Sequence, residues 1–170
     1  MLNGPQVELP AMLAAREKRA ARQQAFLEKY HRPLLSFCLN IPGPVKTTPE
    51  LRTLFDQTCH EIQACLRDLG LTIADSQTIH EATGDEYLLA FAGDAPTVKA
   101  AMTQLEESRP LGRLFDIDIL TAEGQKLSRP VPRRCLLCER QAQDCARSRR
   151  HTVSELTDHI ESMLQDFLQK

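Results

Sequence analysis

The chain has 170 residues and a formal net charge of −2, and 42% of its residues are hydrophobic. This composition is enough for a folded domain, so we expect neither extensive disorder nor a general electrostatic affinity for nucleic acid. No apolar run approaches the length of a membrane span, and the first ten residues do not resemble a signal peptide. We therefore expect a cytoplasmic protein with no membrane partner, whose six cysteines are thiols or metal ligands.

The N-terminal segment, residues 11–30, is rich in Ala, Arg, Gln and Glu, which favours a helix. The apolar face of this helix is thin, because Leu13, Ala20 and Leu27 are its main members. Such a helix is either solvated or turned toward an anion. The basic residues that would face the anion are Arg16, Lys18, Arg19, Arg22 and Lys29.

The next part of the chain alternates between strand and helix patterns. Residues 33–39 form a nearly continuous apolar run that is typical of a buried strand. Residues 48–69 repeat apolar side chains at helical spacing, and a glycine ends the helix. Two strands, 71–81 and 86–92, then flank a turn and predict a hairpin.

A further helix is predicted to start at Asp94 and to end before Pro110, and residues 113–120 alternate as a strand. The resulting order is β-α-β-β-α-β, which predicts an α+β fold with an antiparallel sheet and both helices on one face. This ferredoxin-like arrangement, also found in nucleotidyltransferase palm domains, forms a core over about residues 32–120. In it the first strand should pair with the fourth.

The rest of the chain, residues 121–170, completes a single domain that spans 1–170. It begins with a segment rich in Cys and Arg, up to residue 151, which we predict to be irregular. Thr152 and Glu155 then form a capping box that predicts a C-terminal helix.

Two carboxylates lie two residues apart in the last predicted strand. Asp116 and Asp118 should share one face of the sheet, while Phe115, Ile117 and Ile119 fill the other. Neighbouring carboxylates raise each other's pKa unless a cation neutralises them, and Mg²⁺ binds one or two carboxylates together with substrate phosphates. The alternative is an edge strand with an ordinary solvated face.

Two glycine-containing turns are candidate phosphate sites. Gly112 and Arg113 precede the aspartates and offer close backbone approach and a planar guanidinium. Gly43 and Lys46 follow the first strand, where a plain turn is the alternative.

Four soft ligands lie close together in the Cys/Arg segment, at Cys135, Cys138, Cys145 and His151. A Cys₃His set suits a structural Zn²⁺ site, although the spacing after the first pair is not that of a standard zinc finger. The alternatives are a redox-sensitive pair of Cys135 and Cys138, or thiols that pack a turn.

The same region is strongly basic. Residues 129–150 contain seven arginines and two acidic residues, a local charge of +5 within a chain of −2. A surface of this kind suits an acidic partner or a polyanionic substrate.

The chain resembles a known family at residues 112–118 (Gly-Arg-Leu-Phe-Asp-Ile-Asp) and 132–138 (Pro-Arg-Arg-Cys-Leu-Leu-Cys). Leu13-x2-Arg16-Glu17-x-Arg19 and Pro42-Gly43-Pro44-x-Lys46 carry the same resemblance. It covers nearly the whole chain and is to apo-citrate lyase phosphoribosyl-dephospho-CoA transferase, also called citrate lyase holo-acyl-carrier-protein synthase.

The resemblance implies a nucleotidyltransferase whose donor is 2′-(5″-triphosphoribosyl)-3′-dephospho-CoA. The acceptor would be a serine of the acyl carrier protein subunit of citrate lyase, and pyrophosphate would be released. Asp116 and Asp118 would then hold Mg²⁺, and one of them would take the serine proton. The residues expected at the donor's phosphates are Gly43, Gly112, Arg16, Arg19, Lys46 and Arg113.

Two functions without catalysis are alternatives. The β-α-β-β-α-β order is also that of RNA-binding domains, with Phe37, Tyr87 and Phe91 as stacking residues, but residues 86–91 lack the expected basic-Gly-aromatic motif. The other is a zinc-stabilised protein-interaction module.

Overall fold

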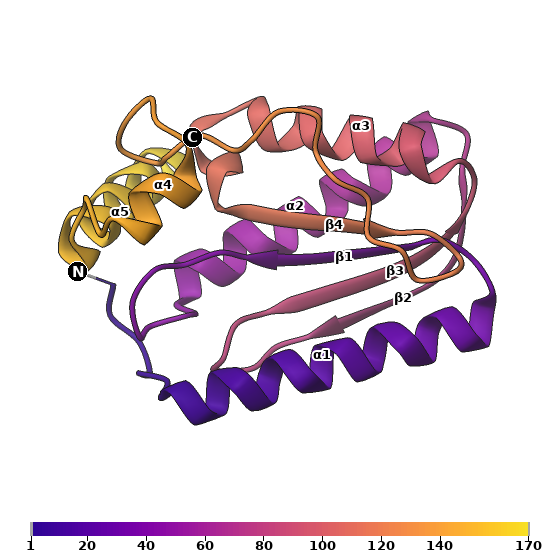
Figure 1. Ribbon diagram of the computed structural model, residues 1–170, viewed down its shortest axis with the longest axis horizontal. Helices are drawn as coiled ribbons and strands as arrows, with labels where there is room; N and C mark the ends of the chain where they lie inside the picture. The colour runs from indigo at the N-terminus through magenta and orange to yellow at the C-terminus, as the bar shows by residue number, and fades with distance from the viewer. Residues whose placement is uncertain (1, 170) are drawn as a thin grey trace.

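The computed structural model describes residues 2–169, which form a four-stranded antiparallel sheet with helices on both faces (Figure 1). The order of the strands across the sheet is β2-β3-β1-β4. The elements in chain order are α1 (Leu9–Tyr30), β1 (Leu34–Leu39), α2 (Pro49–Asp68), β2 (Thr72–Ile79), β3 (Glu86–Ala92), α3 (Ala95–Glu107), a 3₁₀ helix (Pro110–Leu114), β4 (Phe115–Leu120), α4 (Ala142–Arg147) and α5 (Val153–Leu168). The predicted α+β class and the pairing of the first strand with the fourth are confirmed.

The helices begin where the sequence supplies capping side chains. Thr48 accepts a hydrogen bond from the Leu51 amide at the start of α2, and Asp94 accepts one from the Thr97 amide at the start of α3. The predicted capping box of Thr152 is present at the start of α5. Each cap satisfies amides that have no partner within the helix.

The two faces of the sheet differ in character. One face packs against α2 and α3, and this core includes Phe37 and Phe55, which stack with their ring centroids 5.0 Å apart. The other face packs against α1 through a small cluster built on Leu27 and Leu34. Figure 1 shows α1 along one side of the sheet, and α4 and α5 gathered at one end of it.

The apolar face predicted for helix α1 is partly wrong. Leu13 is exposed, as is Ala20, whereas Ala15 and Leu27 are buried. The helix needs few apolar residues because part of the sheet face beneath it is polar, and Gln23 donates a hydrogen bond to the Ser36 hydroxyl on β1. Arg19 and Arg22 of this helix pair with Glu86, whereas Arg16 and Lys18 are exposed, so one side of α1 is ion-paired and another is solvated. That the helix also faces an anionic ligand stays a prediction.

Two further predictions about local structure are wrong. Residues 113–114 belong to a 3₁₀ helix, so the strand starts at Phe115 rather than at residue 113. Pro110 favours the first turn of a helix, and the turn is buried against the end of α3. The predicted irregular segment contains the short helix α4, which carries Cys145. Within residues 2–169, no helix combines the length and the apolar character of a bilayer-spanning segment.

Candidate functional site

The predicted aspartates lie on the sheet face that α1 partly covers. Asp116 is paired across the ladder with Cys38 of β1, and Asp118 with Ser36. Their side chains are 41% and 23% exposed, while Ile117 between them is buried in the opposite core. The prediction that both carboxylates share one face is confirmed. Their partial exposure leaves oxygen atoms available for a ligand.

A third carboxylate shares this face and was not predicted. Glu86, the first residue of β3, pairs with Cys38 on the side away from β4, so Glu86, Cys38 and Asp116 form one row across three strands. The Glu86 side chain is 5% exposed. It accepts hydrogen bonds from Arg19 Nε at 3.0 Å and from Arg22 Nη1 at 2.9 Å, both from α1. This buried ion pair holds α1 on the polar part of the sheet.

Cys38 stands between the two acidic residues of that row. Burial, and after it the neighbouring carboxylates, raise the pKa of the Cys38 thiol to about 12, although Arg19 lowers it. The thiol lies 3.9 Å from Asp116 Oδ2 and can donate to it. Cys38 is therefore protonated at neutral pH and is no nucleophile, because nucleophilic attack requires the thiolate.

Each aspartate already has a cationic neighbour. Lys126 Nζ lies 2.7 Å from Asp118 Oδ2, and Arg133 Nη2 lies 3.7 Å from Asp116 Oδ1. Arg133 also donates to Glu106, a buried residue of α3, at 3.1 Å. Both carboxylates are therefore ion-paired in this structure, and a metal ion bound to them would displace these cations or share the carboxylates with them.

Of the predicted phosphate ligands from the N-terminal half of the chain, Arg19 lies beside this face, whereas Arg16 and Lys46 lie beside each other. Burial and then the charge of Arg16 lower the pKa of Lys46, so these two cations are neighbours. Lys46 Nζ donates to the Ile41 carbonyl at 2.6 Å. The pKa of Arg19 is raised: burial opposes this, but the acidic groups around it, Asp116 among them, outweigh burial. Arg16 and Arg19 lie on α1 one turn apart, so both project from the same part of the helix.

The other predicted ligands lie at the 3₁₀ helix and at the turn after β1. Arg113 Nη1 donates to the Cys135 carbonyl at 3.0 Å. Gly112 is buried, and a Cβ there would lie 2.2 Å from the Glu106 carbonyl oxygen, so its close approach is to the backbone of α3. Gly43 has φ +81°, and a Cβ there would lie 2.8 Å from the Val153 side chain. Direct contact of either glycine with a phosphate stays a prediction.

Comparison with known proteins agrees with the resemblance. Residues 7–167 match the family described as apo-citrate lyase phosphoribosyl-dephospho-CoA transferase. Proteins with that name from Escherichia coli O1:K1 / APEC, Shigella flexneri serotype 5b (strain 8401) and Shigella boydii serotype 18 are each 40% identical over 164 residues, which cover 94% of this chain and 90% of the relative. The chain belongs to this family.

In this transferase family member, a cavity of about 630 Å³ adjoins the Cys/Arg segment. Its walls combine apolar side chains, such as Leu114 and Leu156, with the guanidinium groups of four arginines. The cavity is linked to the aspartates by Arg133, which lines it and also contacts Asp116. The four arginines are Arg113, Arg133, Arg134 and Arg149.

The RNA-binding alternative loses its stacking residues in this structure. Phe37, Tyr87 and Phe91 are buried in the core, and Gln63 of α2 donates to the Tyr87 hydroxyl at 2.7 Å. Rings in these positions are unavailable for stacking on bases, which requires an open sheet surface. The four predicted zinc ligands, by contrast, converge, with all of their ligand atoms within 4.8 Å of one another.

Proposed function

We propose that this protein transfers the phosphoribosyl-dephospho-CoA group from 2′-(5″-triphosphoribosyl)-3′-dephospho-CoA to a serine of the citrate lyase acyl carrier protein, with release of pyrophosphate. The observation that carries the proposal is the pair of half-buried carboxylates, Asp116 and Asp118, on one sheet face in a chain that matches the transferase family over residues 7–167. The thiol ligands and free cysteines suit the reducing cytoplasm, where we place the reaction.

Asp116 and Asp118 are proposed to hold Mg²⁺. Two carboxylates on one face supply the oxygen ligands that this ion prefers. Their present partners, Lys126 and Arg133, would move away from the oxygens that bind the ion. When bound, Mg²⁺ would supply neutralisation of the charge on the donor's phosphates. The fit to the side chains present is therefore good.

The chain's own residues position the reactants. Arg16 and Lys46 are neighbouring cations suited to the outer phosphates of the donor, which leave as pyrophosphate. Glu86 fixes Arg19 beside the aspartates, so that this guanidinium is already oriented before the donor binds. One of the two aspartates takes the proton of the attacking serine, which frees the oxygen to form the new phosphodiester bond.

The exposed basic surface of the Cys/Arg segment is proposed to dock the carrier protein. Arg147, Arg149 and Arg150 are exposed and lie directly before α5. Acyl carrier proteins are acidic, so an arginine surface would accelerate their encounter in a salt-dependent way. Reversing the charge of Arg149 and Arg150 together should weaken carrier binding in a titration and flatten its dependence on salt. Unchanged affinity would exclude this docking surface.

The direct test of the transfer is mass spectrometry of the apo acyl carrier subunit after incubation with enzyme, donor and Mg²⁺. The expected result is a mass gain of one phosphoribosyl-dephospho-CoA group, located on a serine by peptide analysis. A parallel reaction without donor controls for carrier that is already modified. A carrier of unchanged mass in the complete reaction would refute the function.

A further inference from the structure

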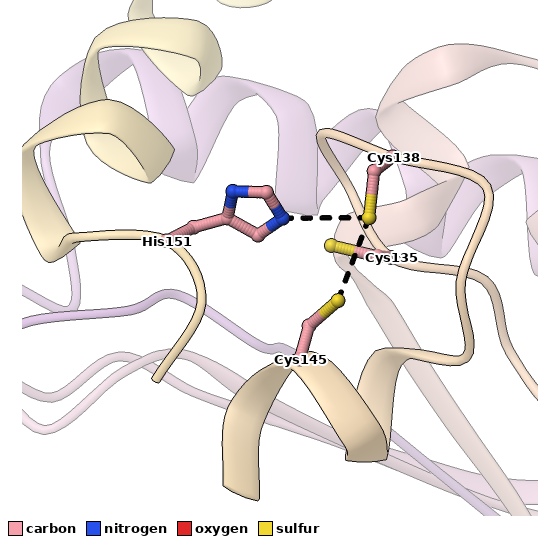
Figure 2. A group of neighbouring side chains, drawn as sticks. All are labelled: Cys135, Cys138, Cys145 and His151. Carbon is pink, nitrogen blue, oxygen red and sulfur yellow. Dashed lines mark hydrogen bonds between the residues drawn. The ribbon is translucent and has the colours of Figure 1, made fainter. Parts of the chain in front are cut away.

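Three thiols and one imidazole from the Cys/Arg segment point toward a common centre (Figure 2). The Sγ atoms of Cys138 and Cys145 are 3.5 Å apart, and His151 Nε2 lies 3.4 Å from Cys138 Sγ. Cys135 completes the group, and all four ligand atoms lie within 4.8 Å of one another. In a tetrahedral site with Zn–S bonds near 2.3 Å, neighbouring ligand atoms are about 3.5–3.8 Å apart. The side chains therefore need only small adjustments to surround one zinc ion.

The backbone around the first two cysteines is a tight hairpin. An isolated antiparallel bridge joins Arg134 to Gln141. The Cys135 amide donates to the Arg140 carbonyl at 2.7 Å. The Ala142 amide donates to the Arg133 carbonyl at 2.8 Å on the other side of the bridge. The hairpin therefore fixes the backbone that carries both thiols.

The last two ligands come from α4 and the turn that ends it. Cys145 is buried in α4, and its carbonyl accepts a hydrogen bond from the Arg150 amide at 3.1 Å. Arg149 adopts a left-handed conformation with φ 48°, which reverses the chain and brings His151 back toward the thiols. Two local structures separated in the sequence thus present their ligands to the same point.

Few apolar side chains hold the segment in place. Leu127 and Leu136 pack against the main core, but Val131 is among the most exposed large apolar side chains, and α4 has only six residues. Small units without a sufficient apolar core usually depend on a cross-link or a metal. A disulfide would use two of the thiols and leave the third and the imidazole without a role, whereas a tetrahedral metal uses all four. Soft thiolate and imidazole ligands select Zn²⁺ over Mg²⁺.

We propose that Cys135, Cys138, Cys145 and His151 bind one Zn²⁺ ion, and that this ion holds the Cys/Arg segment against the catalytic sheet. The site is structural, because four protein ligands leave no open position for a substrate. One contact connects it to the aspartate face, and a second connects it to the 3₁₀ helix that precedes β4. Arg133, two residues before the first ligand, reaches Asp116, and the carbonyl of Cys135 accepts from Arg113. The metal site does not depend on the proposed transfer reaction.

The first test is metal content. Full-length protein purified with reductant and without chelator should contain one zinc ion per chain by inductively coupled plasma mass spectrometry. Cobalt exchanged into the site should show the intense absorption of thiolate-to-cobalt charge transfer. A wild-type protein that neither retains zinc nor takes it up after reduction would overturn the proposal, as would a native disulfide between any two of these cysteines.

Matched variants distinguish the loss of a metal ligand from a general effect of substitution on folding. Cys138→Ser should lose the bound metal, whereas Cys65→Ser, at a half-buried thiol of α2, should keep it. His151→Cys should also keep it, because a Cys₄ set binds zinc equally well in structural sites. Loss of metal from the Cys65 variant as readily as from the Cys138 variant would contradict the assignment, and so would retention by Cys138→Ser.

The second test is the structural role. Because the segment is rich in arginine, trypsin should cleave residues 129–150 at least about ten-fold faster after chelation, while the sheet core stays intact. Added Zn²⁺ should restore protection to the wild type and to His151→Cys. Equal cleavage of the metal-free and metal-loaded proteins would show that the ion does not hold the segment. This measurement needs no donor or carrier protein, so its failure is distinct from failure of the proposed function.

Discussion

The aspartate face and the thiol cluster are both polar sites, but different forces position their side chains. Asp116 and Asp118 belong to a strand whose backbone is paired to β1 and whose other side chains fill the main core. The thiols belong to a hairpin and a six-residue helix with few apolar contacts. A strand positions its polar side chains because its other face is buried, whereas we propose that a bound ion positions the Cys/Arg segment.

The comparison predicts that the aspartates can be neutralised without loss of the fold. Asp116→Asn and Asp118→Asn keep the shape of the side chains but remove the charge that is proposed to hold Mg²⁺. We expect each variant to lower the rate of transfer to the carrier protein by at least about 100-fold. The unfolding midpoint in urea should change little.

The matched control for these variants is Asp68→Asn, at an exposed position in the last turn of α2 on the opposite side of the sheet. It should keep the wild-type rate. Full transfer by both Asp116→Asn and Asp118→Asn in the presence of Mg²⁺ would show that the metal role is wrong.

Substitution of two adjacent arginines tests the connection between the aspartate face and the Cys/Arg segment. Arg133 bridges buried Glu106 and Asp116, whereas Arg134 pairs with Glu139 on the surface. Arg133→Ala would leave Glu106 with weaker compensation from Arg129, 3.6 Å away, so we expect a loss of about 2 kcal/mol in the free energy of unfolding. Arg134→Ala should cost less than about 0.5 kcal/mol. Urea unfolding of the two variants measures this difference. Equal losses in the free energy of unfolding would contradict the role of Arg133 as the link between Glu106 and Asp116.

A substitution at Gly112 tests whether this residue serves packing or donor binding. A methyl group at this position would clash with the Glu106 carbonyl, so Gly112→Ala should lower the free energy of unfolding by about 1–3 kcal/mol. If packing is its whole role, the KM for the donor should be unchanged in the folded fraction. A raised KM with normal stability would instead show that Gly112 approaches the donor, as the sequence suggested.

Periodicity predicted much of the fold and of the site. The alternation in residues 115–119 fixed which side of the strand the aspartates occupy, and the apolar repeat after Thr48 gave α2 with its cap. These features depend on local spacing alone, which is visible in a single sequence. The spacing of the four soft ligands likewise named the residues that the structure brings together.

The order of the strands was predictable, but features that depend on the exact register between distant strands were not. Glu86 lies in the acidic row only because of the register between β3 and β1, and no local pattern encodes that register. Its one signal was a charged residue at the start of a strand that is otherwise apolar. The thin apolar face of α1 had the same origin, since the helix matches a polar sheet surface contributed by residues far away in the sequence.

The last predicted effect concerns Cys38 and is confined to alkaline pH. Because its pKa is raised to about 12 in the folded protein, the folded state keeps a proton that the unfolded chain loses near its ordinary value of about 8.5. Cys38 therefore makes the free energy of unfolding fall as pH rises from about 9 toward 12, by at most about 1.4 kcal/mol per pH unit.

Cys38→Ser removes this titration while retaining a small polar group, so the variant should lose stability less steeply than wild type between pH 9 and 10.5 in urea unfolding. The slope should not vanish, because burial also raises the pKa of Cys59 in the main core. Identical slopes for wild type and variant would show that Cys38 is more accessible to water than its place between Glu86 and Asp116 implies.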